Sequence, residues 1–188
     1  TTAVMQLFER GRVSLEERVG SYWPDFRKNG KDRITLRQVL THYSGLRPSL
    51  PLRPDWSGYD VALQKIVEET PISPPDTRFL YSDLNFIILG ELIRRISGQP
   101  LDVYGQENIF KPLGMKDTSF NPAQGLYDRL APTKENSIGE VHDPLAYRMG
   151  GVAGHAGLFS TADDLAIFAQ TLLDGGRTPG GQILSPLM

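Results

Sequence analysis

Tyr81 is the residue of this sequence that is best placed to do chemistry. It comes directly before a stretch from Asp83 to Gly98 in which apolar residues recur every three or four positions. This spacing predicts a helix with one broad buried face. Ser82 or Asp83 can cap the start of that helix by accepting hydrogen bonds from its first backbone N–H groups. A phenol held at the mouth of a buried helix is positioned to exchange a proton with a bound molecule.

The three histidines are weaker candidates for a chemical role than Tyr81. His42 lies in a short turn sequence, Thr-His-Tyr-Ser-Gly-Leu, where we expect it and Ser44 to be structural. His142, Asp143 and His155 could be combined into a metal site. The sequence has no His-x-x-x-His spacing, however, and no predicted helix sets the geometry of these ligands. We therefore expect no metal and no other cofactor.

The rest of the sequence predicts mainly helices. Ser14 to Glu17 matches a capping box and predicts a short helix to about Val19. Short strands are expected within Gly125 to Pro144, for example around Leu130 and Val141, and Asn85 is expected to be solvated. The other predicted helices cover residues 1–10, 35–44, 61–69, 101–110 and 162–173. The last of these has a predicted core face of Leu165, Phe168, Ala169 and Leu172.

Composition narrows the possible functions. The chain has 188 residues, 39% of them hydrophobic and 22% charged, with a net charge of −2. It has no basic region for nucleic acid or for an anionic membrane surface. No apolar run approaches the roughly 18–20 residues that span a bilayer. The sequence has no cysteine, which excludes disulfides and thiolate metal sites.

Four stretches together resemble one known family. Tyr81-Ser82-Asp83 at the start of its helix is similar to the Tyr-x-Asn motif of serine β-lactamases, penicillin-binding proteins and related esterases, including class C enzymes and DD-peptidases. Three other stretches agree with that family in order and spacing. They are T-L-R-Q-V-L-T-H-Y-S-G-L at 35–46, I-F-K-P-L-G-M-K-D-T-S-F at 109–120, and G-G-V-A-G-H-A-G-L-F-S-T-A-D-D-L-A at 150–166.

The resemblance implies a reaction. In this family a serine attacks an amide or ester carbonyl, and water then releases the acyl group. A lysine one helical turn after the serine shares the proton transfer with the motif tyrosine, because a phenol with a pKa of about 10 is a poor base by itself. Tyr81 would therefore be catalytic. Asp83, where the family usually has Asn, and His155, in a segment that lines the family's cleft, would bind substrate. Asp83 alone needs no function beyond capping the helix, and His155 could be an ordinary loop histidine.

The other two motifs of the family are missing from the sequence. None of the twelve serines has Lys three positions later, and no Lys-Thr-Gly triplet occurs. The family order would place the Ser-x-x-Lys pair before Thr1 and the third motif after Met188. We therefore expect residues 1–188 to be a single partial domain, inactive alone and possessing uncovered apolar faces through which it self-associates.

The resemblance also implies a fold and a location. We expect an α+β fold that is mostly helical and lacks most of the family's antiparallel sheet. The intact protein would act in the periplasm, outside the cell or in the cell envelope. Its substrate would be a β-lactam, a D-Ala-D-Ala peptide or a small ester. The alternative is a non-catalytic binding or sensor domain of the same fold for cell-wall peptide or β-lactam, which Asp83 in place of Asn keeps open.

Overall fold

The computed structural model describes residues 1–135, 137–178 and 181–186, and helices dominate them. The α-helices are α1 (Thr2–Glu9), α2 (Val19–Tyr22), α3 (Leu36–Leu40), α4 (Tyr59–Glu68), α5 (Asp83–Ser97), α6 (Leu101–Gly105), α7 (Lys111–Leu113), α8 (Pro144–Arg148) and α9 (Ala162–Leu173). Two 3₁₀ helices, η1 (Pro24–Arg27) and η3 (Gln124–Arg129), and a π-helical turn, η2 (Gln106–Phe110), complete the helical elements of this part of the chain.

The described strands are short and antiparallel. Strand β1 (Ser119–Phe120) pairs with β2 (Leu158–Phe159), and β3 (Arg177–Thr178) pairs with β4 (Gly181–Gln182). The fold is thus α+β and mostly helical, as the sequence predicts, and only a small amount of sheet lies within the described residues.

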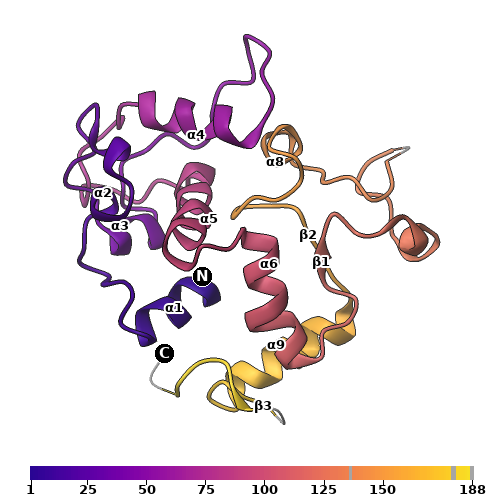
Figure 1. The fold of residues 1–188 in the computed structure, drawn as a ribbon. Helices are drawn as coiled ribbons and strands as arrows, with labels where there is room; N and C mark the ends of the chain where they lie inside the picture. Colours follow the sequence, from indigo (N-terminus) through magenta and orange to yellow (C-terminus); the bar gives the residue numbers. More distant parts are fainter. Residues whose placement is uncertain (136, 179–180, 187–188) are drawn as a thin grey trace.

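Helix α5 is the centre of the structure. It lies between α2 and α3 on one side and α6 on the other, with α1 packed beside it (Figure 1). Its apolar residues Leu84, Ile88 and Leu92 are at most 2% exposed, which confirms the predicted core face. The helix ends at Gly98, whose φ of 78° is in the left-handed region that glycine adopts without strain. The start of α5 is therefore carried on a rigid, buried element.

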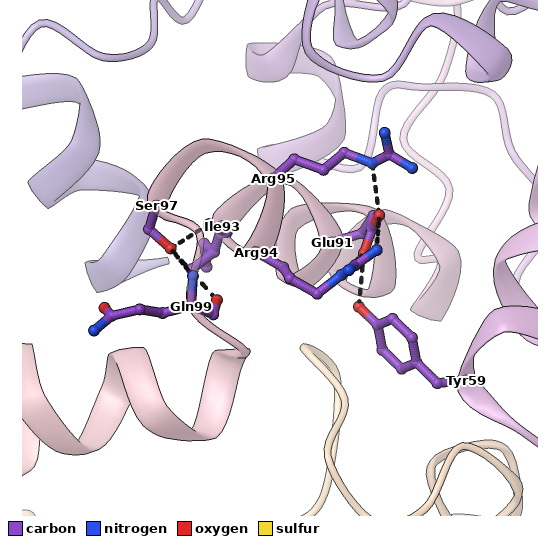
Figure 2. Close-up of polar contacts among 7 residues, drawn as sticks. All are labelled: Tyr59, Glu91, Ile93, Arg94, Arg95, Ser97 and Gln99. Atoms are coloured by element: carbon purple, nitrogen blue, oxygen red, sulfur yellow. Dashed lines mark hydrogen bonds and ion pairs between the residues drawn. The ribbon is translucent and has the colours of Figure 1, made fainter.

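The buried carboxylate of Glu91 ties α5 to its neighbours. Glu91 is fully buried and accepts hydrogen bonds from the guanidinium groups of Arg94 and Arg95 at 2.6–2.8 Å. The Tyr59 hydroxyl of α4 donates a fourth hydrogen bond at 3.1 Å (Figure 2). Burial, and then the negative charge of Glu91, raises the pKa of Tyr59, so this phenol stays protonated. The network is fully paired, as a buried charge requires.

Four details differ from the sequence prediction. Residues 14–17 form a turn, and the helix begins at Val19, because the Glu17 carboxylate accepts from the Ser21 hydroxyl at 2.5 Å and from the backbone N–H of Arg18. Leu130 and Val141 lie outside any strand. The Ser82 side chain makes no capping bond. Asn85 is fully buried, not solvated.

Helix α9 differs from its predicted packing. Thr161 caps it by accepting from the Asp164 N–H at 3.2 Å. The buried positions of α9 are Asp164 and Thr171, whereas the predicted core residue Leu165 is 52% exposed, and Leu173 is 81% exposed. The carboxylate of Asp164 holds α9 against the start of β1 by accepting from the backbone N–H of Asp117 and from the Thr118 hydroxyl. The apolar face of α9 is left largely uncovered by the described residues.

Candidate functional site

The segment from Tyr81 to Asp83 is fixed to the loop at residues 42–48. The Ser82 hydroxyl donates to the Arg47 carbonyl oxygen at 2.6 Å, and the Asp83 N–H donates to the Pro48 carbonyl oxygen at 2.7 Å. Ser82 thus occupies the N-cap position of α5, but its hydroxyl donates to this loop and makes no capping bond. These two bonds set the direction in which the chain enters α5, and with it the position of Tyr81.

Tyr81 projects from this anchored segment. Its side chain is 62% exposed, and its ring packs on His42 with ring centroids 4.7 Å apart and an interplanar angle of 32°. Its hydroxyl has no hydrogen-bond partner among residues 1–135, 137–178 and 181–186. The phenol is therefore held by its ring and has its oxygen free for a partner that these residues do not supply.

His42 joins Tyr81 to the start of α5. Its Nδ1 accepts the Ser82 N–H at 3.1 Å and lies 3.1 Å from the amide nitrogen of Asn85. Because both neighbours are N–H donors, we assign the neutral tautomer with the proton on Nε2. Burial lowers the pKa of His42, and the charge of Asp83 opposes that shift. His42 also adopts a φ of 61°, an uncommon conformation for a residue other than glycine.

Asn85 extends this chain of contacts into the core. Its side-chain oxygen accepts the Ser44 hydroxyl at 2.6 Å, and the Ser44 oxygen in turn accepts the Leu46 N–H at 3.2 Å. Both Ser44 and Asn85 are fully buried. We call the contacts that link Ser44, Asn85, His42 and Tyr81 the phenol support. The Tyr81 ring packs on His42, and His42, Asn85 and Ser44 are linked to one another by polar contacts.

Asp83 meets two residues that are far away in sequence. Its carboxylate, that of Asp143 and a ring nitrogen of His155 all lie within 4.8 Å of one another. The His155 Nε2 is 2.9 Å from Asp143 Oδ1, and the same oxygen caps α8 by accepting the Ala146 N–H at 2.7 Å. The side chain of His155 is only 3% exposed. The three residues, which we call the Asp–Asp–His cluster, come from α5, the start of α8 and the glycine-rich loop.

A close backbone approach places His155. A Cβ atom added at Gly154 would lie 1.9 Å from the Phe86 carbonyl oxygen and 3.3 Å from the Gly90 nitrogen. Only glycine fits so close to a helix backbone. The glycine-rich loop therefore runs against α5, and the next residue, His155, is brought to the first turn of that helix.

The structure brings together the three residues chosen from sequence and adds others. Tyr81 and Asp83 lie at the start of α5, and His155 is brought to the same helix end. Of the two residues considered with His155 as metal ligands, Asp143 is in the cluster and His142 is not. Sequence reasoning missed the roles of His42 and Asn85. The signal for His42 was present in the Thr-His-Tyr-Ser-Gly-Leu turn, which agrees with the family and which we interpreted as only structural, whereas Asn85 was expected to be solvated.

Comparison with known proteins decides the family. The family model described as Beta-lactamase matches residues 1–188. The chain belongs to the β-lactamase family. The resemblance drawn from the four sequence stretches is thereby confirmed.

Several known proteins are similar to this chain over nearly its whole length. A protein of Bacillus subtilis named N-acetylmuramyl-L-alanine amidase is 36% identical over 93% of this chain, and the match covers 47% of that protein. A Yersinia pestis structure titled β-lactamase/D-alanine carboxypeptidase is 25% identical, with a TM-score of 0.71, over 90% of this chain and 49% of the other. A penicillin-binding protein homologue from Caulobacter crescentus shares the fold with a TM-score of 0.78 at 23% identity, over 99% of this chain and 56% of the other.

The chain spans about half the length of these relatives. Among its described helices, none is long and apolar enough to cross a membrane.

Proposed function

We propose that the protein is an acyl-transfer hydrolase in which Tyr81 shares a proton with a serine and a lysine that lie outside residues 1–188. The observation that carries the proposal is the Tyr81 hydroxyl. It is exposed, its ring is fixed by the phenol support, and it has no partner among the described residues. A general base must lie within hydrogen-bond reach of the proton that it removes, so a fixed ring and a free oxygen are the required arrangement.

The substrate proposed is an amide of a cell-wall peptide. Asp83 and His155 would bind it beside the reacting carbonyl. An ionised Asp83 can only accept hydrogen bonds, so it favours a substrate that presents N–H donors, as a peptide amide does. The Bacillus subtilis relative is named an amidase, and the Yersinia pestis title names D-alanine carboxypeptidase together with β-lactamase, so both names support an amide substrate. Small esters are weaker candidates, because they carry no N–H group for Asp83, whereas penicillin-type β-lactams do carry an acylamino N–H. An enzyme with such a substrate would act in the cell envelope.

The second candidate is a non-catalytic domain that binds the same peptides. Asp83 favours it, because the family's usual Asn can both donate and accept at this position whereas a carboxylate cannot donate. The two candidates differ in whether a covalent intermediate forms.

Mass spectrometry of the protein expressed from its complete reading frame separates them. The sample is mixed with a D-Ala-D-Ala peptide, an N-acetylmuramyl peptide or penicillin and quenched within seconds. The enzyme predicts a mass increase equal to the acyl group, mapped to a serine outside residues 1–188. Reversible binding of the peptide with no mass increase from any of the three compounds would support the binding domain instead.

A further inference from the structure

We propose that the Asp–Asp–His cluster is a binding site for a divalent transition-metal ion of the zinc type. Its three members offer one imidazole nitrogen and two carboxylate oxygens, which lie within 4.8 Å of one another. Three protein ligands of these kinds, with a fourth position left for water or substrate, are a common zinc arrangement. The sequence disfavoured a metal here because it has no His-x-x-x-His spacing and no predicted helix sets the geometry of His142, Asp143 and His155. In the structure Asp83, not His142, is the third potential ligand. The close approach of the glycine-rich loop to α5 brings the three residues together.

His155 carries the inference beyond the presence of two carboxylates. Its side chain is 97% buried, that is, 3% exposed, and its Nε2 is aimed at Asp143 inside the cluster. Its other nitrogen, Nδ1, is buried and has no partner among the described residues. The contact between Nε2 and Asp143 is therefore the one polar contact of this ring among the described residues. When the ring proton is on Nδ1, Nε2 presents an electron pair to the two carboxylates, and a metal ion between them is the partner that this electron pair requires.

The two carboxylates also lack a permanent cation. Among the described residues, Asp83 makes no side-chain hydrogen bond or ion pair, and Asp143 pairs only with His155 and the Ala146 N–H. Two carboxylates held this close repel each other, and a divalent ion between them removes the repulsion. Movement of the ring proton from Nε2 to Nδ1 leaves the imidazole neutral and frees the Nε2 electron pair for the metal.

The geometry needs only side-chain adjustment. Zinc bonds of about 2.0–2.2 Å in a tetrahedron place neighbouring ligand atoms about 3.4 Å apart. The contact between His155 and Asp143, now 2.9 Å, would open by about half an ångström, and Asp83 would turn inward. Asp83 is free to do so, because its described contacts are made by its backbone. An ion bound here would take the carboxylate that we assign to substrate, so it would compete with substrate.

Calorimetric titration of the protein expressed from its complete reading frame with zinc chloride tests the proposal without any catalysis. We expect one zinc ion per chain, and binding at least about tenfold weaker in His155→Gln and in Asp83→Asn. Asp143→Asn keeps the cap on α8 and should weaken binding equally. His142→Gln is the matched control, since it removes an exposed neighbouring histidine outside the cluster and should bind as the wild type does. Magnesium chloride, which prefers all-oxygen sites, should give no heat of binding.

Three results would overturn the site. They are no zinc binding at about 100 times the protein concentration, unchanged binding in His155→Gln, or equal loss in His142→Gln. If His155→Gln is shown by circular dichroism not to fold, Asp83→Asn decides the question, because its side chain has no structural partner. Because the titration needs no turnover, its outcome is independent of the acyl-transfer proposal.

Discussion

Replacing Asn85 by Asp is the sharpest perturbation of the phenol support. The change keeps the size and shape of the side chain and replaces only the N–H donor that faces His42 Nδ1 with an oxygen. Two acceptors would then face each other in a fully buried place, where the oxygen of Asn85 already accepts from Ser44. A proton on either the new carboxyl group or His42 Nδ1 would restore the hydrogen bond between them.

The free energy needed to add this proton determines how much Asn85→Asp lowers the free energy of unfolding. Keeping the introduced carboxyl group protonated at pH 7 costs about 4 kcal/mol, because its ordinary pKa is about 3.9 and each unit is worth about 1.4 kcal/mol. Protonating an imidazole of ordinary pKa, about 6.5, costs about 0.7 kcal/mol at pH 7, and burial lowers the pKa of His42 and so adds to that cost. That route also leaves the Ser82 N–H without an acceptor, which costs about 1–3 kcal/mol. Asn85→Asp should therefore lower the free energy of unfolding by about 2–4 kcal/mol at pH 7.

The pH dependence distinguishes this account from simple loss of packing. At pH 4.5 the carboxyl group takes up a proton at a cost of under about 1 kcal/mol, so the difference from the wild type should nearly vanish. Urea unfolding of both proteins at pH 7 and pH 4.5, followed by circular dichroism, measures it. Ser44→Ala is the control and should cost about 1–2 kcal/mol at both pH values. A loss below 0.5 kcal/mol at pH 7, or one that is the same at both pH values, would refute the reasoning.

Three further predictions concern the scaffold. Burial lowers the pKa of Lys31 from 10.5 to about 8, so the unfolded chain binds more protons between these values and stability should rise with pH from 8 to 10.5. Urea unfolding should show this rise in the free energy of unfolding for the wild type and no rise for Lys31→Met. The same pH dependence in both proteins would contradict the prediction. The double change Arg94→Met and Arg95→Met leaves Glu91 buried without a cation and should cost about 3–5 kcal/mol in chemical unfolding, so a cost below about 1 kcal/mol would contradict the network. Leu173→Glu, on the exposed face of α9, should reduce any self-association of the chain in light scattering, and unchanged association would place the contact elsewhere.

Sequence periodicity was sufficient for the helices that bury one side within this chain. The apolar spacing of α5 predicted its buried face, and the helix predicted to begin at Thr35 is present as α3, where Thr35 and Gln38 form a capping box. The same reasoning failed for α9, whose apolar residues have the correct spacing but lie exposed. Periodicity says which face of a helix is apolar, and only the tertiary arrangement says what covers it.

Part of the site, like part of the fold, was predictable from the sequence. Tyr81 and Asp83 follow from a local pattern, because neighbours in sequence stay neighbours at a helix start. The Asp–Asp–His cluster depends on contacts over tens of residues, and Asp143 carries no local pattern apart from its ability to cap α8. The burial of Asn85 was missed because a polar residue in a first helical turn is usually solvated, whereas here the 42–48 loop covers it and supplies its partners.

The central claim is that the Tyr81 hydroxyl takes part in acyl transfer. Its most direct test is the rate at which a fluorescent penicillin, or the best substrate from the mass-spectrometric panel, labels the protein expressed from its complete reading frame, compared with the Tyr81→Phe variant. Phenylalanine keeps the ring stacked on His42 and removes only the oxygen, so the fold should be unchanged. We predict labelling that is about 100-fold slower or more in Tyr81→Phe, the usual contribution of a general acid–base group. Labelling of the variant at the wild-type rate would remove Tyr81 from the mechanism.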